Sequence, residues 1–319
     1  MLKILIGYDG SACAEAALDD LRRAGLPARG VEALALSVAE VYMLPPPPSS
    51  YEIVEAATAE DAREADRLKY AGNVRAFEEA QGFARRAGER LRENFPEWEV
   101  KTEAVSGSPA WELIVRADTW KPDLIVVGSH GRSALGRFVL GSVSQRALTE
   151  ARCSVRVARG RVEVEPEAPA RVVVGVDGSE GSDAAVRAVA ARDWPAQSEA
   201  RVLIVHDPLV PSLVGRIIPP VAKWTKQVNE AETEWLRQTA ESATQKLSDA
   251  GLVVSSAVVE GDPKRLLVEE AARWGADCLF VGSTGFSNRI ERFLLGSVSS
   301  AVAARAHCSV EVVRERKPE

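Results

Sequence analysis

The sequence predicts an α/β protein of two tandem doubly wound units, each with a five-stranded parallel sheet flanked by helices. Three observations support this fold class. The chain has 319 residues, which is enough for two domains of ordinary size. Its two halves share a series of short motifs, and within each half apolar strand-like runs alternate with segments of helical periodicity. Such alternation is typical of parallel sheets with right-handed helical crossovers.

The internal repeat consists of five motifs that occur twice in the same order. In the first half they are Ile4–Ser11, Gly107–Pro109, Leu124–Gly131, Leu140–Ser144 and Cys153–Val155. Their counterparts are Val173–Ser179, Gly261–Pro263, Leu279–Gly285, Leu295–Ser299 and Cys308–Val310. The common order indicates a tandem duplication of a unit of roughly 150 residues. We expect the units to cover residues 1–160 and 169–319, joined by a charged linker at 161–168.

The first unit begins with Lys3–Tyr8, a largely apolar run that suits a strand buried on both faces. Ser11–Ala24 carries apolar residues at helical spacing, and its Arg22-Arg23 pair is interpreted as a solvated face because acidic residues lie nearby. An apolar stripe from Val74 to Leu91 predicts a long helix, and Pro109 favours the start of another over 110–119. The remaining elements are strands at 32–38, 100–105, 123–127 and 154–158 and a helix at 142–150.

The second unit repeats this series. Its strands are predicted near 171–176, 201–205, 253–258, 278–281 and 309–313, and its long helix near 230–248. The first unit is longer by about thirteen residues around Pro45–Ala71, an insertion that surface loops tolerate. Within it, Pro45–Pro48 predicts a stiff surface loop.

Composition and charge exclude several classes of function. The net charge of −6 does not provide the basic surface of a general nucleic-acid-binding protein. Four cysteines without a CxxC pair argue against a disulfide framework or a cysteine zinc site, and the three histidines are scattered, so no metal site is expected. The sequence lacks a signal-peptide pattern and a long uncharged apolar stretch. We therefore expect a cytoplasmic protein without membrane or nucleic-acid partners.

The segment with the clearest chemical meaning runs from Gly128 to Ser142. Gly128-Ser129-His130-Gly131 follows an apolar strand, and after nine intervening residues Gly141-Ser142 begins a helix. Glycines let the backbone approach a ligand, consecutive N–H groups bind anions, and a helix N-terminus adds positive potential. This pattern predicts a phosphate-bearing ligand at the carboxyl end of the sheet. A tight turn with an N-cap serine is the alternative, but the occurrence of the pattern in both units favours the phosphate.

Asp9 and Asp177 follow the first strand of each unit, within Asp-Gly-Ser sequences. In a doubly wound sheet the ends of the first and fourth strands lie side by side, so each aspartate can face the glycine segment and bind a sugar hydroxyl or a base. The alternative is a role at the start of the following helix, for which Ser11 and Ser179 are the better N-cap candidates.

With the Asp-Gly-Ser turn ahead of it, the Gly-x2-Gly-x9-Gly-Ser pattern resembles the ATP-binding branch of the universal stress proteins. The resemblance covers both halves, as in tandem-domain members. It implies the strand order 3-2-1-4-5 in each sheet and an ATP cofactor, with or without Mg²⁺, over the ends of strands one, two and four. The binding residues that it implies in the first unit are Gly7, Asp9, Val38, Val127, Gly128, His130, Gly131, Gly141, Ser142 and Val143. Those in the second unit are Gly175, Asp177, Val205, Val281, Gly282, Thr284, Gly285, Gly296, Ser297 and Val298.

The second unit departs from the pattern at two places. Ten residues, Phe286 to Leu295, separate Gly285 from Gly296 where the first unit has nine between Gly131 and Gly141, and Thr284 stands in place of His130. One extra residue can turn N–H donors away from a phosphate. The second unit is therefore expected to be the weaker ATP site.

Three functions remain open from the sequence. We favour an ATP-binding regulatory protein with slow or no hydrolysis, because no residue supplies a clear base for water and no lysine lies in the glycine segment. The alternatives are a slow ATPase and a nucleotide-free dimerisation scaffold.

The last strand of each unit carries a prediction about assembly. In the implied order Ser154–Ala158 and Ser309–Val313 lie at sheet edges, and an exposed edge favours pairing. The resemblance implies a dimer contact at this edge, so we predict an intrachain pseudo-dimer with the two strands antiparallel across a pseudo-two-fold axis. A homodimer of whole chains is a further, weaker expectation.

Overall fold

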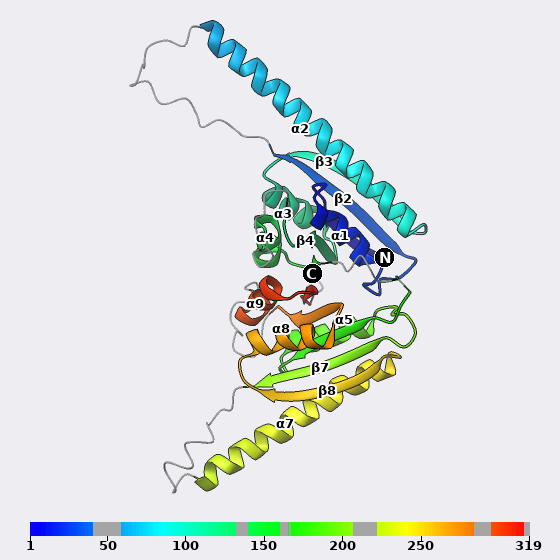
Figure 1. Ribbon diagram of the computed structural model, residues 1–319, viewed down its shortest axis with the longest axis vertical. Helices are drawn as coiled ribbons and strands as arrows, with labels where there is room; N and C mark the ends of the chain where they lie inside the picture. The colour runs from blue at the N-terminus through cyan, green and yellow to red at the C-terminus, as the bar shows by residue number, and fades with distance from the viewer. Residues whose placement is uncertain are drawn as a thin grey trace, which may run out of the picture.

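The structure is a computed structural model that describes residues 1–40, 59–131, 140–159, 165, 167–206, 222–283 and 295–315 (Figure 1). The first unit contains β1 (Leu2–Gly7), α1 (Ala12–Leu21), β2 (Val31–Glu40), α2 (Ala59–Asn94), β3 (Glu99–Gly107), α3 (Pro109–Trp120), β4 (Leu124–Gly128), α4 (Ser142–Glu150) and β5 (Ser154–Ala158). The second contains β6 (Arg171–Val176), α5 (Glu180–Ala190), β7 (Glu199–His206), α7 (Ala222–Asp249), β8 (Val253–Glu260), α8 (Pro263–Trp274), β9 (Cys278–Gly282), α9 (Ser297–Arg305) and β10 (Ser309–Val313). Each strand lies within two residues of its predicted bounds.

The strands of both units join in one sheet, in the order β3-β2-β1-β4-β5-β10-β9-β6-β7-β8. Each half follows the order 3-2-1-4-5, and every pair within a half is parallel. The fold class is therefore confirmed. Between the halves β5 pairs antiparallel with β10, as the edge positions of these strands predict.

Helices cover the two faces of the sheet differently. On one face α3, α4, α8 and α9 pack on a single apolar core that continues across the junction of the units, through residues such as Val155, Val157, Val310 and Val312. On the other face α1 and α2 cover a core of the first unit, and α5 and α7 cover a separate core of the second. Figure 1 shows α2 and α7 at opposite ends of the molecule.

Two local predictions are corrected. Helix α1 ends at Leu21, and Arg23 beyond it is buried instead of solvated, because it contacts the carbonyl groups of Glu165 and Ala168 near the linker. Residues 59–71 of the insertion are helical, so α2 reaches 36 residues against 28 in α7. The predicted loop at Pro45–Pro48 lies outside the described residues.

Candidate functional site

Hydrogen bonds hold the end of β4 against the start of α4. The Ser144 hydroxyl donates to the carbonyl oxygen of Gly128 at 2.6 Å, and the Gly141 N–H donates to the carbonyl oxygen of Ser129 at 2.9 Å. These two bonds hold the two ends of the glycine segment, at Gly128–Ser129 and at Gly141–Ser144, next to each other. They place the helix N-terminus at the carboxyl end of the sheet, where open α/β sheets bind ligands.

Helix α4 begins without a side-chain cap. Its N-cap is Gly141, in an extended conformation, and no side chain of the described residues caps the helix. Ser142, which the alternative interpretation takes as the N-cap, is instead the first helical residue and is exposed. N–H groups at the start of a helix have no intrahelical acceptor and lie at the positive end of its dipole. This terminus therefore suits an anion.

A cavity of about 570 Å³ lies at the carboxyl ends of β1, β2 and β4. This volume is typical of small-molecule sites. All ten residues that the sequence predicts for the first site line this cavity: Gly7, Asp9, Val38, Val127, Gly128, His130, Gly131, Gly141, Ser142 and Val143. The fold thus brings together residues that lie up to 136 positions apart in the chain.

The cavity has two walls that the sequence interpretation missed. One is formed by Ala76, Glu79 and Ala80 of α2, and the other by Ser108–Ala110 at the start of α3. The repeated glycine-x-proline motif at the end of β3 was a signal for the second wall, since all strands of a unit end at one edge. The apolar stripe of α2 offered no comparable signal, because it does not show which helical turn crosses the strand ends.

The glycines of the site have two different roles. A Cβ atom on Gly141 would lie 3.4 Å from the Cα of His130 and 3.6 Å from the nitrogen of Gly131, within the space between Gly131 and Gly141. Because Gly131 and Gly141 have no side chains, the space between them is lined by backbone atoms of residues 129–131 and 141; we call this space the cradle. A Cβ on Gly128 would instead lie 2.8 Å from the carbonyl oxygen of Cys13 in α1. Gly128 is therefore required for the packing of α1 on β4.

Asp9 orders the turn at the start of α1, one of the two roles that the sequence left open, and its carboxylate also lies beside the glycine segment. Its Oδ1 accepts a hydrogen bond from the Ser11 N–H at 3.0 Å, while the Ser11 hydroxyl accepts from the Ala14 N–H as the N-cap of α1. Its Oδ2 lies 3.0 Å from the position of a Cβ on Gly131. The carboxylate therefore faces the cradle while it also orders the turn after β1. In the second unit Asp177 accepts from the Ser179 N–H in the same way.

His130, which lines the cavity, has one ring nitrogen that is buried without a hydrogen-bond partner among the described residues. Its Nδ1 lies 3.0 Å from the Ser129 hydroxyl, whereas Nε2 is buried and has no hydrogen-bond partner among the described residues. Burial, and then the positive charge of Arg159, lower the pKa of His130 below its ordinary value of 6.5. The imidazole is therefore neutral near pH 7.

The lowered pKa of His130 predicts a dependence of stability on pH. As the pH falls below about 6.5, the unfolded chain binds the proton before the folded chain does, so that His130 contributes a loss of stability on the acid side. In His130→Gln the loss of unfolding free energy between pH 7.5 and pH 5.5 should be smaller than in the wild type. Urea unfolding at both pH values measures this difference, and equal losses in the two proteins would contradict it.

The second unit has the same arrangement where it is described. The Ser299 hydroxyl donates to the Gly282 carbonyl oxygen at 2.6 Å, and the Gly296 N–H donates to the Ser283 carbonyl oxygen at 2.7 Å. Gly296 is the N-cap of α9, again without a side-chain cap. The predicted residues at the ends of β6, β7 and β9 and at the start of α9 are Gly175, Asp177, Val205, Val281, Gly282, Gly296, Ser297 and Val298. Thr284 and Gly285 lie outside the described residues.

A metal centre and a membrane span are two further features that the described part of the chain could contain. There, no group of three or more His, Cys, Asp or Glu side chains is placed to hold a metal ion. No helix in the same residues has the length and apolar character needed to cross a bilayer.

Comparisons with known proteins agree with the repeat and the fold. A model of the universal stress protein family matches residues 1–159 and 170–314. A universal stress protein of Mycobacterium tuberculosis is 30% identical over 317 residues, which cover 98% of this chain and 97% of the relative. The solved universal stress protein of Archaeoglobus fulgidus covers 98% of both chains with a TM-score of 0.62 at 19% identity, a likeness of fold. A universal stress protein solved in complex with cAMP matches 46% of this chain at 28% identity, with a TM-score of 0.31.

Proposed function

Since the chain belongs to the universal stress protein family, we propose that it is an ATP-binding regulatory protein that hydrolyses ATP slowly or not at all. The observation that carries this proposal is the backbone-lined cradle between Gly131 and Gly141, which opens into the cavity at the strand ends. In this proposal the adenine nucleotide binds in the cavity of the first unit. We also expect a cytoplasmic location.

The chemistry of the cavity walls orients the nucleotide. The phosphates would bind at the cradle, where backbone N–H groups and the start of α4 attract negative charge. The opposite part of the cavity carries the apolar side chains of Leu36 and Val38 and the acidic side chains of Glu40 and Glu79. Carboxylates repel phosphates, whereas they accept hydrogen bonds from sugar hydroxyls and amino groups. The adenosine would therefore lie against β2 and α2, with Asp9 between the two ends.

The same walls favour binding over catalysis. Among the described residues that line the cavity, none is a lysine or an arginine. Phosphoryl transfer depends on positioning and on neutralisation of developing charge, for which backbone N–H groups supply only part. Mg²⁺ brought by the nucleotide would supply further charge neutralisation at the phosphates.

Extraction of bound nucleotide tests the proposal directly. The purified protein is denatured, and the released small molecules are separated by anion exchange and compared with ATP, ADP and AMP standards. ATP or ADP in the extract, or saturable heat on titration of stripped protein with ATP, is the expected result. Neither signal would favour the nucleotide-free scaffold. ADP formed from added ATP at a steady rate over hours would favour the slow ATPase.

The two sites should differ in affinity. A one-residue insertion that turns one N–H donor away removes a charge-assisted hydrogen bond worth about 1.5–3 kcal/mol, or roughly tenfold or more in affinity. We therefore expect the first unit to bind ATP at least about tenfold more tightly than the second. Calorimetric titration of Gly131→Val and of Gly285→Val isolates the sites one at a time. Equal affinities would mean that the longer segment of the second unit places its extra residue away from the phosphates.

A further inference from the structure

The antiparallel pairing of β5 and β10 places one position of each unit on the pseudo-two-fold axis. Both strands read Ser-Val-x-Val, and the variable residue is Arg156 in β5 and Glu311 in β10. The register pairs Arg156 with Glu311, so the axis passes between two equivalent positions. These equivalent positions carry opposite charges.

Around this point the junction is symmetric. The N–H of Arg159, just after β5, donates to the Ser309 hydroxyl at 2.9 Å, and the N–H of Arg314, just after β10, donates to the Ser154 hydroxyl at 3.1 Å. Both arginine side chains also reach the opposite unit, where Arg159 donates to the carbonyl oxygen of Ala303 in α9 at 2.6 Å. Arg314 donates in the same way to the last turn of α4. The hydrogen bonds around the junction are therefore equivalent for β5 and β10.

The apolar side of the junction also treats them alike. Val155 and Val157 of β5 and Val310 and Val312 of β10 all lie in the continuous core beneath α4 and α9. A pair of two β5 strands, or of two β10 strands, would bury the same valines in the same register. Burial of apolar surface therefore does not distinguish the unlike pair from a like pair.

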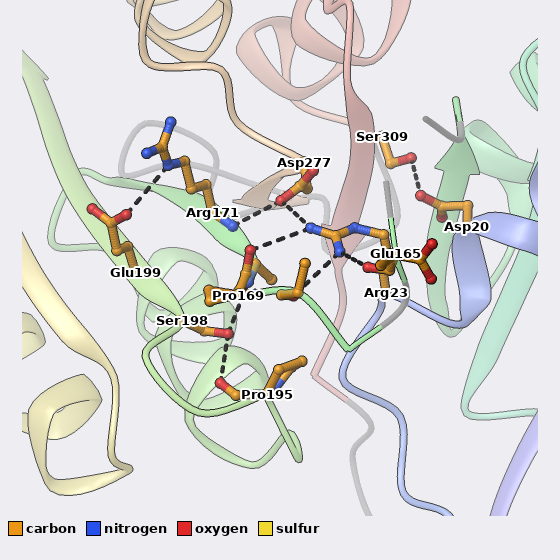
Figure 2. Close-up of polar contacts among 12 residues, drawn as sticks. Asp20, Arg23, Glu165, Pro169, Arg171, Pro195, Ser198, Glu199, Asp277 and Ser309 are labelled. Carbon is orange, nitrogen blue, oxygen red and sulfur yellow. Dashed lines mark hydrogen bonds and ion pairs between the residues drawn. The ribbon is translucent and has the colours of Figure 1, made fainter. Parts of the chain in front are cut away.

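The charged side of the junction does distinguish them. The Arg156 side chain is 1% exposed; its Nε donates to Asp20 at 2.6 Å and its Nη1 to Glu311 at 3.2 Å. Glu311 accepts a second bond from Arg192 of its own unit. The Ser309 hydroxyl donates to Asp20 across the junction (Figure 2). Signs alternate along the row Asp20, Arg156, Glu311, Arg192. A like pair would place Arg156 against Arg156, or Glu311 against Glu311, in a buried position.

We propose that Arg156 and Glu311 make the central sheet edge selective for the unlike unit. The edge of β5 pairs with a strand that carries a carboxylate at the axis position and does not pair with a second β5. The edge of β10 pairs with a strand that carries a cation at the axis position. Like charges in direct contact disfavour a wrong partner, and this is how interfaces gain specificity beyond shape. Through these edges one chain closes on itself and does not assemble with the like unit of a second copy.

A second set of contacts holds the two units of one chain next to each other. Arg23, after α1, pairs with Asp277 at 2.9 Å and donates to the carbonyl oxygens of Glu165, Ala168 and Pro169 around the linker (Figure 2). The linker end and the start of β9 are thereby held against the first unit. The Arg23 contacts keep the second unit of the same chain close to the first, while the charges of Arg156 and Glu311 determine which strand can pair at the edge.

The test uses full-length chains whose axis charges are made alike. Asp20→Asn with Arg156→Glu gives an acidic chain with glutamate at both axis positions. Arg192→Gln with Glu311→Arg gives a basic chain with arginine at both. The chain with all four substitutions is the matched control, because its axis again carries one glutamate opposite one arginine, with the two charges exchanged between the strands. Donor-labelled and acceptor-labelled chains are mixed, unfolded in urea and refolded, and energy transfer and mass are measured.

The proposal predicts mixed complexes of the acidic with the basic chain at a level at least about tenfold above that of either chain with itself. The control chain should refold like the wild type, with the same mass, thermal midpoint and absence of transfer. Should the acidic and basic chains fail to refold alone, recovery of the fold in the control chain would still support selectivity. A control chain as impaired as the acidic and basic chains, or mixing without preference, would overturn the proposal.

Discussion

The substitution Gly131→Val is expected to abolish ATP binding at the first unit while the fold is retained. A Cβ at this position lies 3.0 Å from Oδ2 of Asp9, so the branched valine side chain would crowd that carboxylate at the wall of the cavity. The phosphates then lose two or more N–H contacts, each worth about 1.5–3 kcal/mol, so that the affinity falls by roughly a hundredfold or more. Calorimetric titration of stripped protein with ATP measures the loss.

Two further glycine variants make this result interpretable. A Cβ on Gly82 in α2 has no atom within 4 Å, so Gly82→Val is the matched control and should bind ATP as the wild type does. A Cβ on Gly141 meets its neighbours at ordinary contact distances, so Gly141→Ala should fold normally and weaken binding to an intermediate degree. An unchanged affinity in Gly131→Val would show that the phosphates bind away from the cradle.

The substitution Arg156→Ala is expected to destabilise the junction of the units by about 3–5 kcal/mol. It leaves Asp20 without a cation and Glu311 with Arg192 alone, and these carboxylates are only 6% and 2% exposed. Loss of one partner from a buried ion pair leaves an uncompensated charge in a poorly solvated place, which costs far more than the pair contributes. Urea unfolding, followed by the near-ultraviolet signal of the tryptophans, measures the change.

The control for this variant is an ion pair on the surface. Arg29 pairs with Glu97 where both side chains are at least half exposed, so Arg29→Ala should change the unfolding free energy little. An equally small change in Arg156→Ala would mean that water reaches Asp20 and Glu311 in the variant. Because Arg156 lies outside the set of cavity residues, ATP affinity at the first unit serves as a check that the unit itself remains folded.

Local pattern determined much of this protein in advance. Runs of β-branched and aliphatic residues located every described strand within two residues, since such signals depend on neighbours in the chain. The duplication fixed the number of units, and the glycine spacing pointed to Gly128–Ser142 as the chemical segment. All ten residues assigned to the first site line one cavity, because parallel strands of a unit end at the same edge.

The roles of individual residues within these elements needed the tertiary structure. The two glycines at 128 and 131 look equivalent in the sequence, yet one admits the backbone of Cys13 and the other borders the cradle. Ser142 looks like an N-cap, but the cap is one residue earlier, at Gly141. Arg23 has the acidic neighbours of a solvated residue and is instead buried against the linker. The roles of Gly128 and Arg23 depend on contacts with distant segments, and the cap depends on the hydrogen bond from Gly141 to Ser129, none of which the local pattern predicts.

The junction of the units shows the division most clearly. The sequence alone determined that β5 and β10 are equivalent strands with alternating valines, and that their edges favour pairing. In the sequence, the arginine of one strand and the glutamate of the other give no sign of a buried partner. Only the register of the paired strands, together with α1, brings Arg156, Glu311 and Asp20 into one buried row. A charge without a counterpart is tolerated in water but is costly in the protein interior. Because the two charges are buried at the junction, they restrict which strand can pair there.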